Sequence, residues 1–177
     1  MTLHRTILDG DAALVLKLLN EGADVNYHIP SGVVTPLYVA SLRYVIVNVD
    51  GRRTSPDYLA IVRLLLAYGA DANAPITTDG MTTLLHLIAF AGRDVCRAMA
   101  ELLIRYGAEV DRVDRDGYTP LFWACRNRHV DLVEVLLQNG ANINRKFPAI
   151  EGANTLLVAV SIGDVGLVHR LVRYGAT

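Results

Sequence analysis

The apolar positions between residues 114 and 144 predict two short helices that follow a turn. Asp116-Gly117 is a turn signal, because glycine tolerates the positive φ that tight turns require. Thr119 suits the N-cap of a helix and Pro120 its first position, where a missing backbone N–H removes no hydrogen bond. A second apolar stripe follows at helical spacing and stops at a glycine, which commonly ends a helix in the left-handed conformation.

The same unit recurs along the chain. Apolar runs end in a Gly-Ala pair whose glycine stands at positions 22, 69, 107, 140 and 175, at steps of 47, 38, 33 and 35 residues. Thr35-Pro36-Leu37 repeats Thr119-Pro120-Leu121, and Gly-Ala-Asp-Val-Asn at 22–26 parallels Gly-Ala-Asn-Ile-Asn at 140–144. Such self-similarity indicates stacked supersecondary units that share one continuous core.

These motifs resemble the ankyrin repeat, whose period is about 33 residues. The resemblance covers the whole chain as five units, at about 1–26, 31–73, 78–111, 114–144 and 152–177. It implies a single all-α domain, a solenoid of helix-turn-helix units with turns or β-hairpin loops between them. It also implies a module that binds a protein or peptide partner.

The second unit is longer than the fourth. Its Thr-Pro motif lies 34 residues before the glycine stop, against 21 in the fourth unit. The extra residues fall at about 44–54, where β-branched residues and Asp50-Gly51 predict an extended or hairpin-like loop between the helices. This insertion is either a tolerated surface loop or a packed or binding loop. After it, Ser55 is expected to cap a helix that begins at Pro56.

The first and third units carry histidines with different expected roles. A terminal unit must be more polar on its free face, so His4, Arg5 and Lys17 are expected on the solvent side. His86 stands near the position of the histidine that, in the family, ties neighbouring loops. The second helix of the third unit is expected from about residue 94 to 106, one turn earlier than its counterpart.

The fourth and fifth units depart from the family pattern. Phe122 replaces the family's histidine and is expected to contribute packing instead. The fifth unit follows a loop that is two residues longer and contains Phe147, Pro148 and Ile150. Its many valines are unusual for a last unit, so we expect either further domains beyond Thr177 or a covered end face.

Charge and composition exclude several classes of function. Seventeen Lys and Arg against 18 Asp and Glu leave a net charge of −1. No global charge therefore recruits nucleic acid or a membrane surface. No apolar run reaches the roughly 18 residues of a membrane span, and the start lacks the apolar block of a signal peptide. Cys96 and Cys125 are interpreted as reduced core thiols, which favours an intracellular location, cytoplasmic or nuclear.

The sequence shows no constellation typical of catalysis, a cofactor or a metal. The five histidines have no metal-binding spacing, and no glycine loop matches a phosphate-binding motif. Cys125 and His129 are four residues apart but straddle the predicted break between helices, so a buried thiol is favoured over a nucleophile. We therefore expect a protein without enzymatic activity.

By the resemblance, partners are bound by the turn tips and by the exposed ends of the first helices. The residue types found there, including Met, Tyr, Phe and Arg, are enriched in interfaces. For Phe90 the alternative is packing against the next helix. The candidate partner-binding residues are Arg43, Asp79, Met81, Phe90, Arg115, Asp116, Tyr118, Arg126 and Asn127.

Three further interpretations stay open at this point. Basic residues gather around the fourth unit, but acidic residues are interleaved, so this is either a solvated face or a contact for an acidic peptide. A second interpretation makes the array the targeting or substrate-recruiting domain of a larger enzyme or effector. In the third, it associates with another copy of itself through an apolar end.

Overall fold

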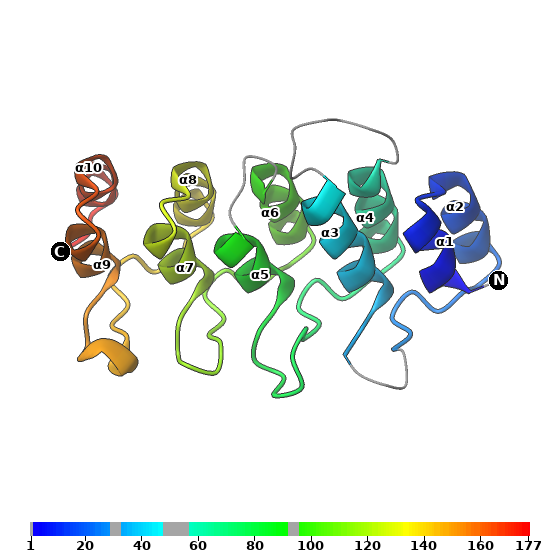
Figure 1. Ribbon diagram of the computed structural model, residues 1–177, viewed down its shortest axis with the longest axis horizontal. Coiled ribbons are helices and arrows are strands. Elements are labelled where there is room, and N and C mark those ends of the chain that lie inside the picture. Colours follow the sequence, from blue (N-terminus) through cyan, green and yellow to red (C-terminus); the bar gives the residue numbers. More distant parts are fainter. Residues whose placement is uncertain (1, 29–32, 48–56, 92–95) are drawn as a thin grey trace.

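The structure is a computed structural model that describes residues 2–28, 33–47, 57–91 and 96–177. Its helices form successive antiparallel pairs arranged in a row (Figure 1). The first helices of the pairs are α1 (Leu3–Asp9), α3 (Pro36–Val47), α5 (Leu84–Ala91), α7 (Pro120–Arg126) and α9 (Thr155–Ser161). The second helices are α2 (Ala12–Asn20), α4 (Tyr58–Ala67), α6 (Cys96–Arg105), α8 (Val130–Gln138) and α10 (Val165–Arg173).

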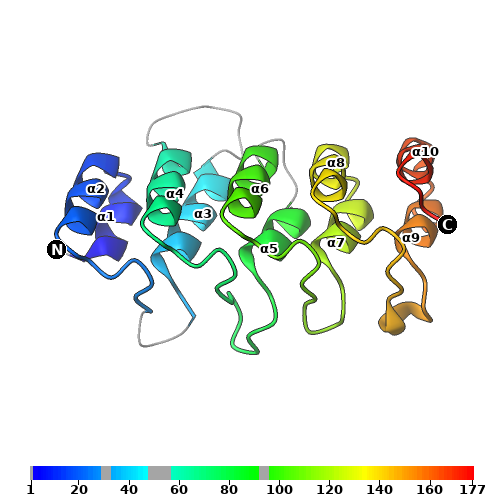
Figure 2. The same cartoon turned by 180° about the vertical axis from the view of Figure 1, so that it is seen from behind.

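The first helices form one layer and the second helices another, as the view from behind also shows (Figure 2). Loops between pairs project from one edge of the row as a series of tips. Each tip is numbered by the helix pair that follows it, so the third, fourth and fifth tips precede α5, α7 and α9. Isolated antiparallel bridges join Pro75 to Thr83 and Phe147 to Ala153 at the bases of two tips. The last tip also carries a short 3₁₀ helix, η2 (Pro148–Ile150). The described part of the chain is therefore an all-α solenoid with hairpin-like loops.

Side-chain caps explain where several helices begin. The carboxylates of Asp11 and Asp164 accept hydrogen bonds from the backbone N–H three residues on, and the hydroxyl of Thr119 does the same. At the other end, Gly140 has a φ of 87° and the next N–H, of Ala141, donates back to Leu136 O at 3.0 Å. The predicted turn, helix, helix and glycine stop is therefore confirmed in the fourth unit.

One hydrophobic cluster runs through the row from Leu3 to Ala176. Corresponding leucines of the second helices, Leu65, Leu103, Leu136 and Leu171, are fully buried within it. Burying such side chains contributes about 1.5–3 kcal/mol each relative to exposure. Since each pair buries a face against its neighbours, the array is stabilised by contacts between adjacent units.

The prediction that His4 faces solvent is wrong, because its side chain is only 8% exposed. Its Nε2 lies 3.4 Å from Val34 O, at the base of the next tip, and its ring meets the edge of Tyr27. The first unit thus keeps the inter-unit histidine contact, which polarity reasoning about a terminal unit missed. Arg5 and Lys17 do lie on the solvent side, in exposed ion pairs with Asp9 and Glu21.

The predicted boundaries around the insertion need two corrections. Residues 44–47 form the last turn of α3 and are not an extended loop, because Tyr44 is buried and Val45 packs on the core. The α4 helix begins at Tyr58, since the carboxylate of Asp57 accepts from Ala60 N at 3.1 Å and caps it. The expected cap at Ser55 and the rest of the insertion lie outside the described residues, as does the expected start of α6 at Asp94.

Candidate functional site

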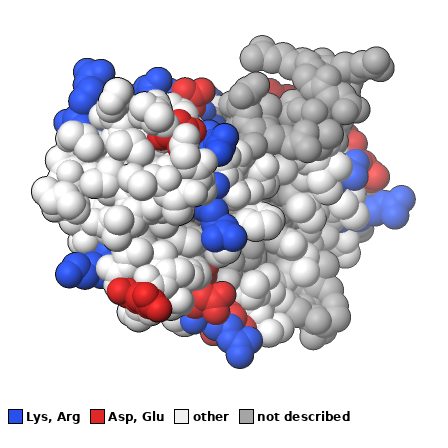
Figure 3. Space-filling view, turned by 60° about the vertical axis from the view of Figure 1, so that its left-hand side comes forward, with Lys and Arg blue, Asp and Glu red and all other residues white. Residues whose placement is uncertain are grey.

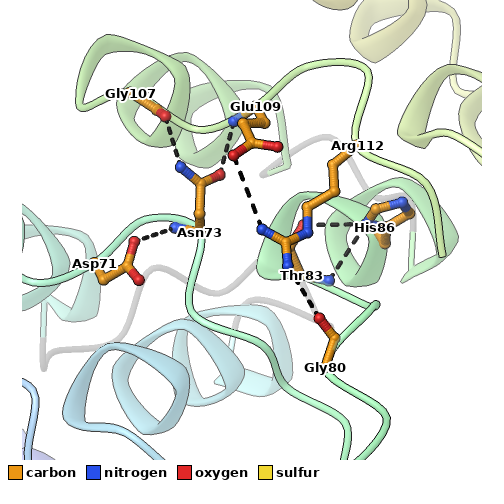
Figure 4. Close-up of polar contacts among 8 residues, drawn as sticks. All are labelled: Asp71, Asn73, Gly80, Thr83, His86, Gly107, Glu109 and Arg112. Carbon is orange, nitrogen blue, oxygen red and sulfur yellow. Dashed lines mark hydrogen bonds and ion pairs between the residues drawn. The ribbon is translucent and has the colours of Figure 1, made fainter.

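Asparagine side chains connect the loops of successive units. The amide of Asn73 donates through Nδ2 to Gly107 O at 2.8 Å, and its Oδ1 accepts from Glu109 N at 2.8 Å (Figure 4). Asn26 and Asn144 make the equivalent pairs of bonds to the glycine stop of the next unit and to the residue two positions later. These reciprocal bonds fix the spacing between neighbouring tips.

A buried histidine ties the third tip to the fourth. Nδ1 of His86 accepts from the backbone N–H of Thr83 at 3.3 Å, which leaves the proton on Nε2, 3.3 Å from Tyr118 O. Burial lowers the pKa of His86, which keeps the ring neutral and able to donate to that carbonyl. Arg112 adds a second tie by donating to Gly80 O at 3.0 Å (Figure 4). His86 thus ties neighbouring loops, as expected of a histidine near the family's position.

The fourth tip is closed around the buried carboxylate of Asp114. Its Oδ1 accepts from the backbone N–H groups of Asp116 at 3.0 Å and Tyr118 at 2.9 Å. Its Oδ2 accepts from Nε1 of Trp123 on α7 at 2.7 Å. One carboxylate therefore fixes both the shape of this tip and its attachment to the helix that follows, which sequence analysis did not predict.

The third tip presents a carboxylate to solvent. Oδ1 of Asp79 accepts from the hydroxyl of Thr77 at 2.6 Å and from Met81 N at 3.0 Å. The hydrogen bond from Thr77 is the main cause that lowers the pKa of Asp79, and Met81 N–H and the charge of Arg115 act in the same direction. Asp79 and Arg115 thus place opposite charges on neighbouring tips.

Aromatic side chains gather where the fourth tip meets α5, α7 and the fifth tip. The rings of Tyr118 and Phe122 are stacked with centroids 3.8 Å apart, and Phe147 meets Phe122 edge-on at 5.0 Å. Phe122 and Phe147 are buried, so the prediction that Phe122 supplies packing is confirmed. Phe90 meets the edge of Trp123 at 5.5 Å yet stays 61% exposed, so packing alone does not cover it.

The structure places the candidate partner-binding residues in two different environments. Six are exposed on the tips or on the first-helix layer: Asp79, Met81, Phe90, Arg115, Asp116 and Arg126.

The other three are half-buried. Tyr118 packs in the aromatic cluster, and Nδ2 of Asn127 donates to Phe90 O at 3.1 Å. Arg43 lies over the ring of Tyr58 on α4 and donates to its hydroxyl at 3.3 Å. For all nine, a role in binding stays a prediction.

A hollow of about 550 Å³ lies between α7 and α9, and sequence analysis missed it. Its apolar lining comes from both helices and from the fifth tip, and its polar residues lie at the helix C-termini. The longer loop before the fifth unit was the only sequence signal, because it supplies Ile150. The lining residues are Phe122, Arg126, Asn127, Ile150, Ala153, Leu157, Val158, Ser161 and Ile162.

The thiol of Cys125, singled out by its spacing from His129, is buried and not activated as a nucleophile. Burial raises the pKa of Cys125 to about 12, so this thiol is protonated at neutral pH. Burial also lowers the pKa of His129, which occupies the N-cap position of α8. Within the described ranges, no group of three or more His, Cys, Asp or Glu could hold a metal ion. None of the described helices combines the length and hydropathy of a membrane span.

Comparison with known proteins gives a consistent match over much of the row. The sequence model of the family described as Ankyrin repeats (3 copies) matches residues 54–147, which include α4 to α8. The B-cell lymphoma 3 protein homolog of Mus musculus is 37% identical over 55% of this chain and 21% of its own length. The Neurogenic locus Notch protein of Drosophila melanogaster is 30% identical over 96% of this chain and 6% of its own length.

A viral protein shows a similar degree of identity. The putative ankyrin repeat protein FPV031 of Fowlpox virus is 30% identical over 91% of this chain and 43% of its own length. The chain thus spans less than half the length of each of these three relatives.

Proposed function

Because this chain belongs to the ankyrin repeat family, we propose that it is a protein-interaction module that binds a protein or peptide partner. The binding surface consists of the third and fourth tips and the exposed ends of α5 and α7. Met81, Phe90 and Arg115 provide its anchors, because Met, Phe and Arg are enriched at protein interfaces.

The observation that carries this proposal is the fixed geometry of exposed anchors. His86, Arg112 and Asn73 bond neighbouring loops to one another, and Asp114 closes the tip between them. The anchors are therefore presented by backbone that is already ordered. A partner that binds such a surface pays little conformational entropy for ordering it.

The proposal predicts that removing the anchors abolishes partner capture without unfolding the array. A variant with Met81→Ala, Phe90→Ala and Arg115→Ala is compared with wild type by affinity purification from source cells and quantitative mass spectrometry. The captured amount of any protein that binds this surface is expected to fall at least about tenfold. The reason is that each anchor contributes on the order of 1 kcal/mol or more to binding.

The matched control changes exposed residues of the second-helix layer, with Arg63→Ala, Arg105→Ala and Tyr106→Ala. Circular dichroism establishes that both variants keep the helical content of wild type. Capture that survives the loss of Met81, Phe90 and Arg115, or that is lost only in the control, would contradict the proposed surface.

A second candidate is a recruiting role within a larger enzyme or effector. The lengths of the three relatives described above favour this role, because the chain matches less than half of the length of each. Sequencing the reading frame beyond Thr177 tests this candidate. A stop codon directly after Thr177, with no domain before Met1, would count against it.

A further inference from the structure

The hollow between α7 and α9 combines an apolar floor with a cationic end. Val158 and Phe122 are buried at its base, and Ile150 and Leu157 form apolar walls. At the C-terminal ends of the two helices, Arg126 supplies the only charged group among the described residues of the lining. Large uncharged areas cover this end of the molecule, with charged side chains set among and around them (Figure 3).

Neither Arg126 nor Arg128 forms a salt bridge with a described carboxylate. Arg126 is exposed, and no salt bridge or side-chain hydrogen bond joins it to another described residue. Arg128 lies close by, because its guanidinium donates to Ile162 O, at the edge of the hollow. It too forms no salt bridge within the described part of the chain, whereas Arg170 on the neighbouring helix is paired with Glu134. A ligand carboxylate would therefore meet uncompensated positive charge.

The hollow is an open groove, not an enclosed cavity. Leu157, on its wall, is 56% exposed, whereas small-molecule sites bury most of the ligand surface. An open groove of this kind suits one large side chain presented by a longer chain that passes across it. Guanidinium groups at one end then favour an acidic residue close to that side chain in the bound segment.

We propose that this groove binds an internal segment of a partner protein in which a large apolar residue lies within a few positions of Asp or Glu. The apolar side chain packs on Phe122, Val158 and Leu157, and the carboxylate pairs with Arg126. This inference rests on the proposed function and extends it by defining a recognition element on the partner. It adds the α7–α9 groove to the proposed surface, with which the groove shares Arg126 at the end of α7.

Selection from a library of random twelve-residue peptides displayed on phage tests the proposal. The enriched peptides are expected to share Leu, Phe, Ile, Met or Trp within about four positions of an acidic residue, the reach of a short extended segment. They are then synthesised with amidated C-termini, and their Kd for wild type and variants is measured by fluorescence anisotropy. Arg126→Gln and Leu157→Ala are each expected to weaken binding about tenfold, which corresponds to the loss of one good contact.

Two matched controls lie outside the groove. Arg105→Gln removes an exposed cation on α6, and Val172→Ala truncates an exposed apolar residue on α10. Both are expected to change Kd less than about twofold. Because Arg126 and Leu157 are exposed, all four variants should fold, and circular dichroism checks this.

Four outcomes would overturn the proposal: no enriched peptide, enriched peptides without acidic residues, equal affinity of Arg126→Gln and wild type, or binding that requires a free C-terminal carboxylate. Peptides that lose affinity with Met81→Ala or Phe90→Ala but not with the groove variants would defeat this inference alone. The proposed function would then stand, because the tip surface would still bind.

Discussion

His86 and Phe122 occupy the same place in successive units and stabilise the tips in different ways. Each stands three residues after the threonine that directly precedes its helix, Thr83 or Thr119. His86 bonds to the next tip through Nε2, whereas Phe122 stacks on Tyr118 of its own tip and meets Phe147 of the next. A directional polar contact is thus replaced by aromatic packing, which contributes about 0.5–1.5 kcal/mol per pair beyond area burial.

The buried state of His86 predicts that stability falls in mild acid. Burial lowers the pKa of His86 below 6.5, so between its folded-state pKa and 6.5 the unfolded chain binds more protons than the folded one. The stabilisation is therefore fully present above pH about 6.5 and is lost as pH falls through the folded-state pKa. The midpoint of urea unfolding should drop between about pH 7.5 and about pH 5.5, and His86→Gln should reduce this drop.

His169→Gln serves as the control, because His169 is exposed on α10. Some pH dependence should remain in His86→Gln, since burial also lowers the pKa values of His4 and His129. If the midpoint of urea unfolding falls equally with pH in wild type and in His86→Gln, the His86 ring does not cause the loss of stability in mild acid.

At the scale of elements, the loops between pairs repeat one hydrogen-bond pattern with a single variation. Asn26, Asn73 and Asn144 each donate to a glycine carbonyl and accept from a backbone N–H of the next unit. Asp111 stands at the equivalent place, four residues after a glycine stop, and accepts from Asn142 N with both carboxylate oxygens. A carboxylate has no proton to donate, so the carbonyl of Gly140 gains no bond from it.

Asp111→Asn should therefore stabilise the array. The amide would keep the bond from Asn142 N and add one to Gly140 O, for a gain of about 0.5–1.5 kcal/mol in the free energy of unfolding. Urea denaturation measures this change. Asp116→Asn makes the same chemical change on an exposed side chain of the neighbouring tip and should have an effect within about 0.5 kcal/mol. If Asp111→Asn is no more stable than the Asp116→Asn control, the expected hydrogen bond from the new amide to Gly140 O does not form.

At the scale of the molecule, stability is distributed along the row. The α8 helix packs against α6 and α7, whereas α10, at the end of the row, packs mainly against α9. The last pair also leaves Val160, Val165 and Val172 exposed, each by more than half. In a stacked array each unit is stabilised by its own contacts and by its interfaces, so a unit at the end of the row opens most easily.

Matched cavity variants in the two helices should separate local from shared stability. Leu136 and Leu171 are fully buried at corresponding positions of α8 and α10, and truncation of either to alanine should cost about 2–5 kcal/mol. Hydrogen exchange should show Leu171→Ala accelerating exchange in α9 and α10 only. Leu136→Ala should accelerate it in helices on both sides of α8. Indistinguishable exchange patterns would mean that the row unfolds as one cooperative block.

Local signals in the sequence were sufficient for the repeating architecture. Asp11 and Thr119 cap their helices and Gly140 ends one, because these effects depend on residues within one turn of the chain. The period of these signals then fixed the family and the solenoid. The same period also predicted that most candidate residues on the tips are exposed, since turns at regular spacing must project from the same edge of the row.

Contacts between units were decided only by the tertiary structure. His4 is buried because Val34 and Tyr27 approach it, and residues 44–47 are helical because core packing outweighs their β propensity. The α7–α9 groove exists because Ile150 and Leu157 are placed opposite Phe122 by the stacking of two units. Periodicity determines that units stack, but which side chains meet depends on their shape and on distances across the interface.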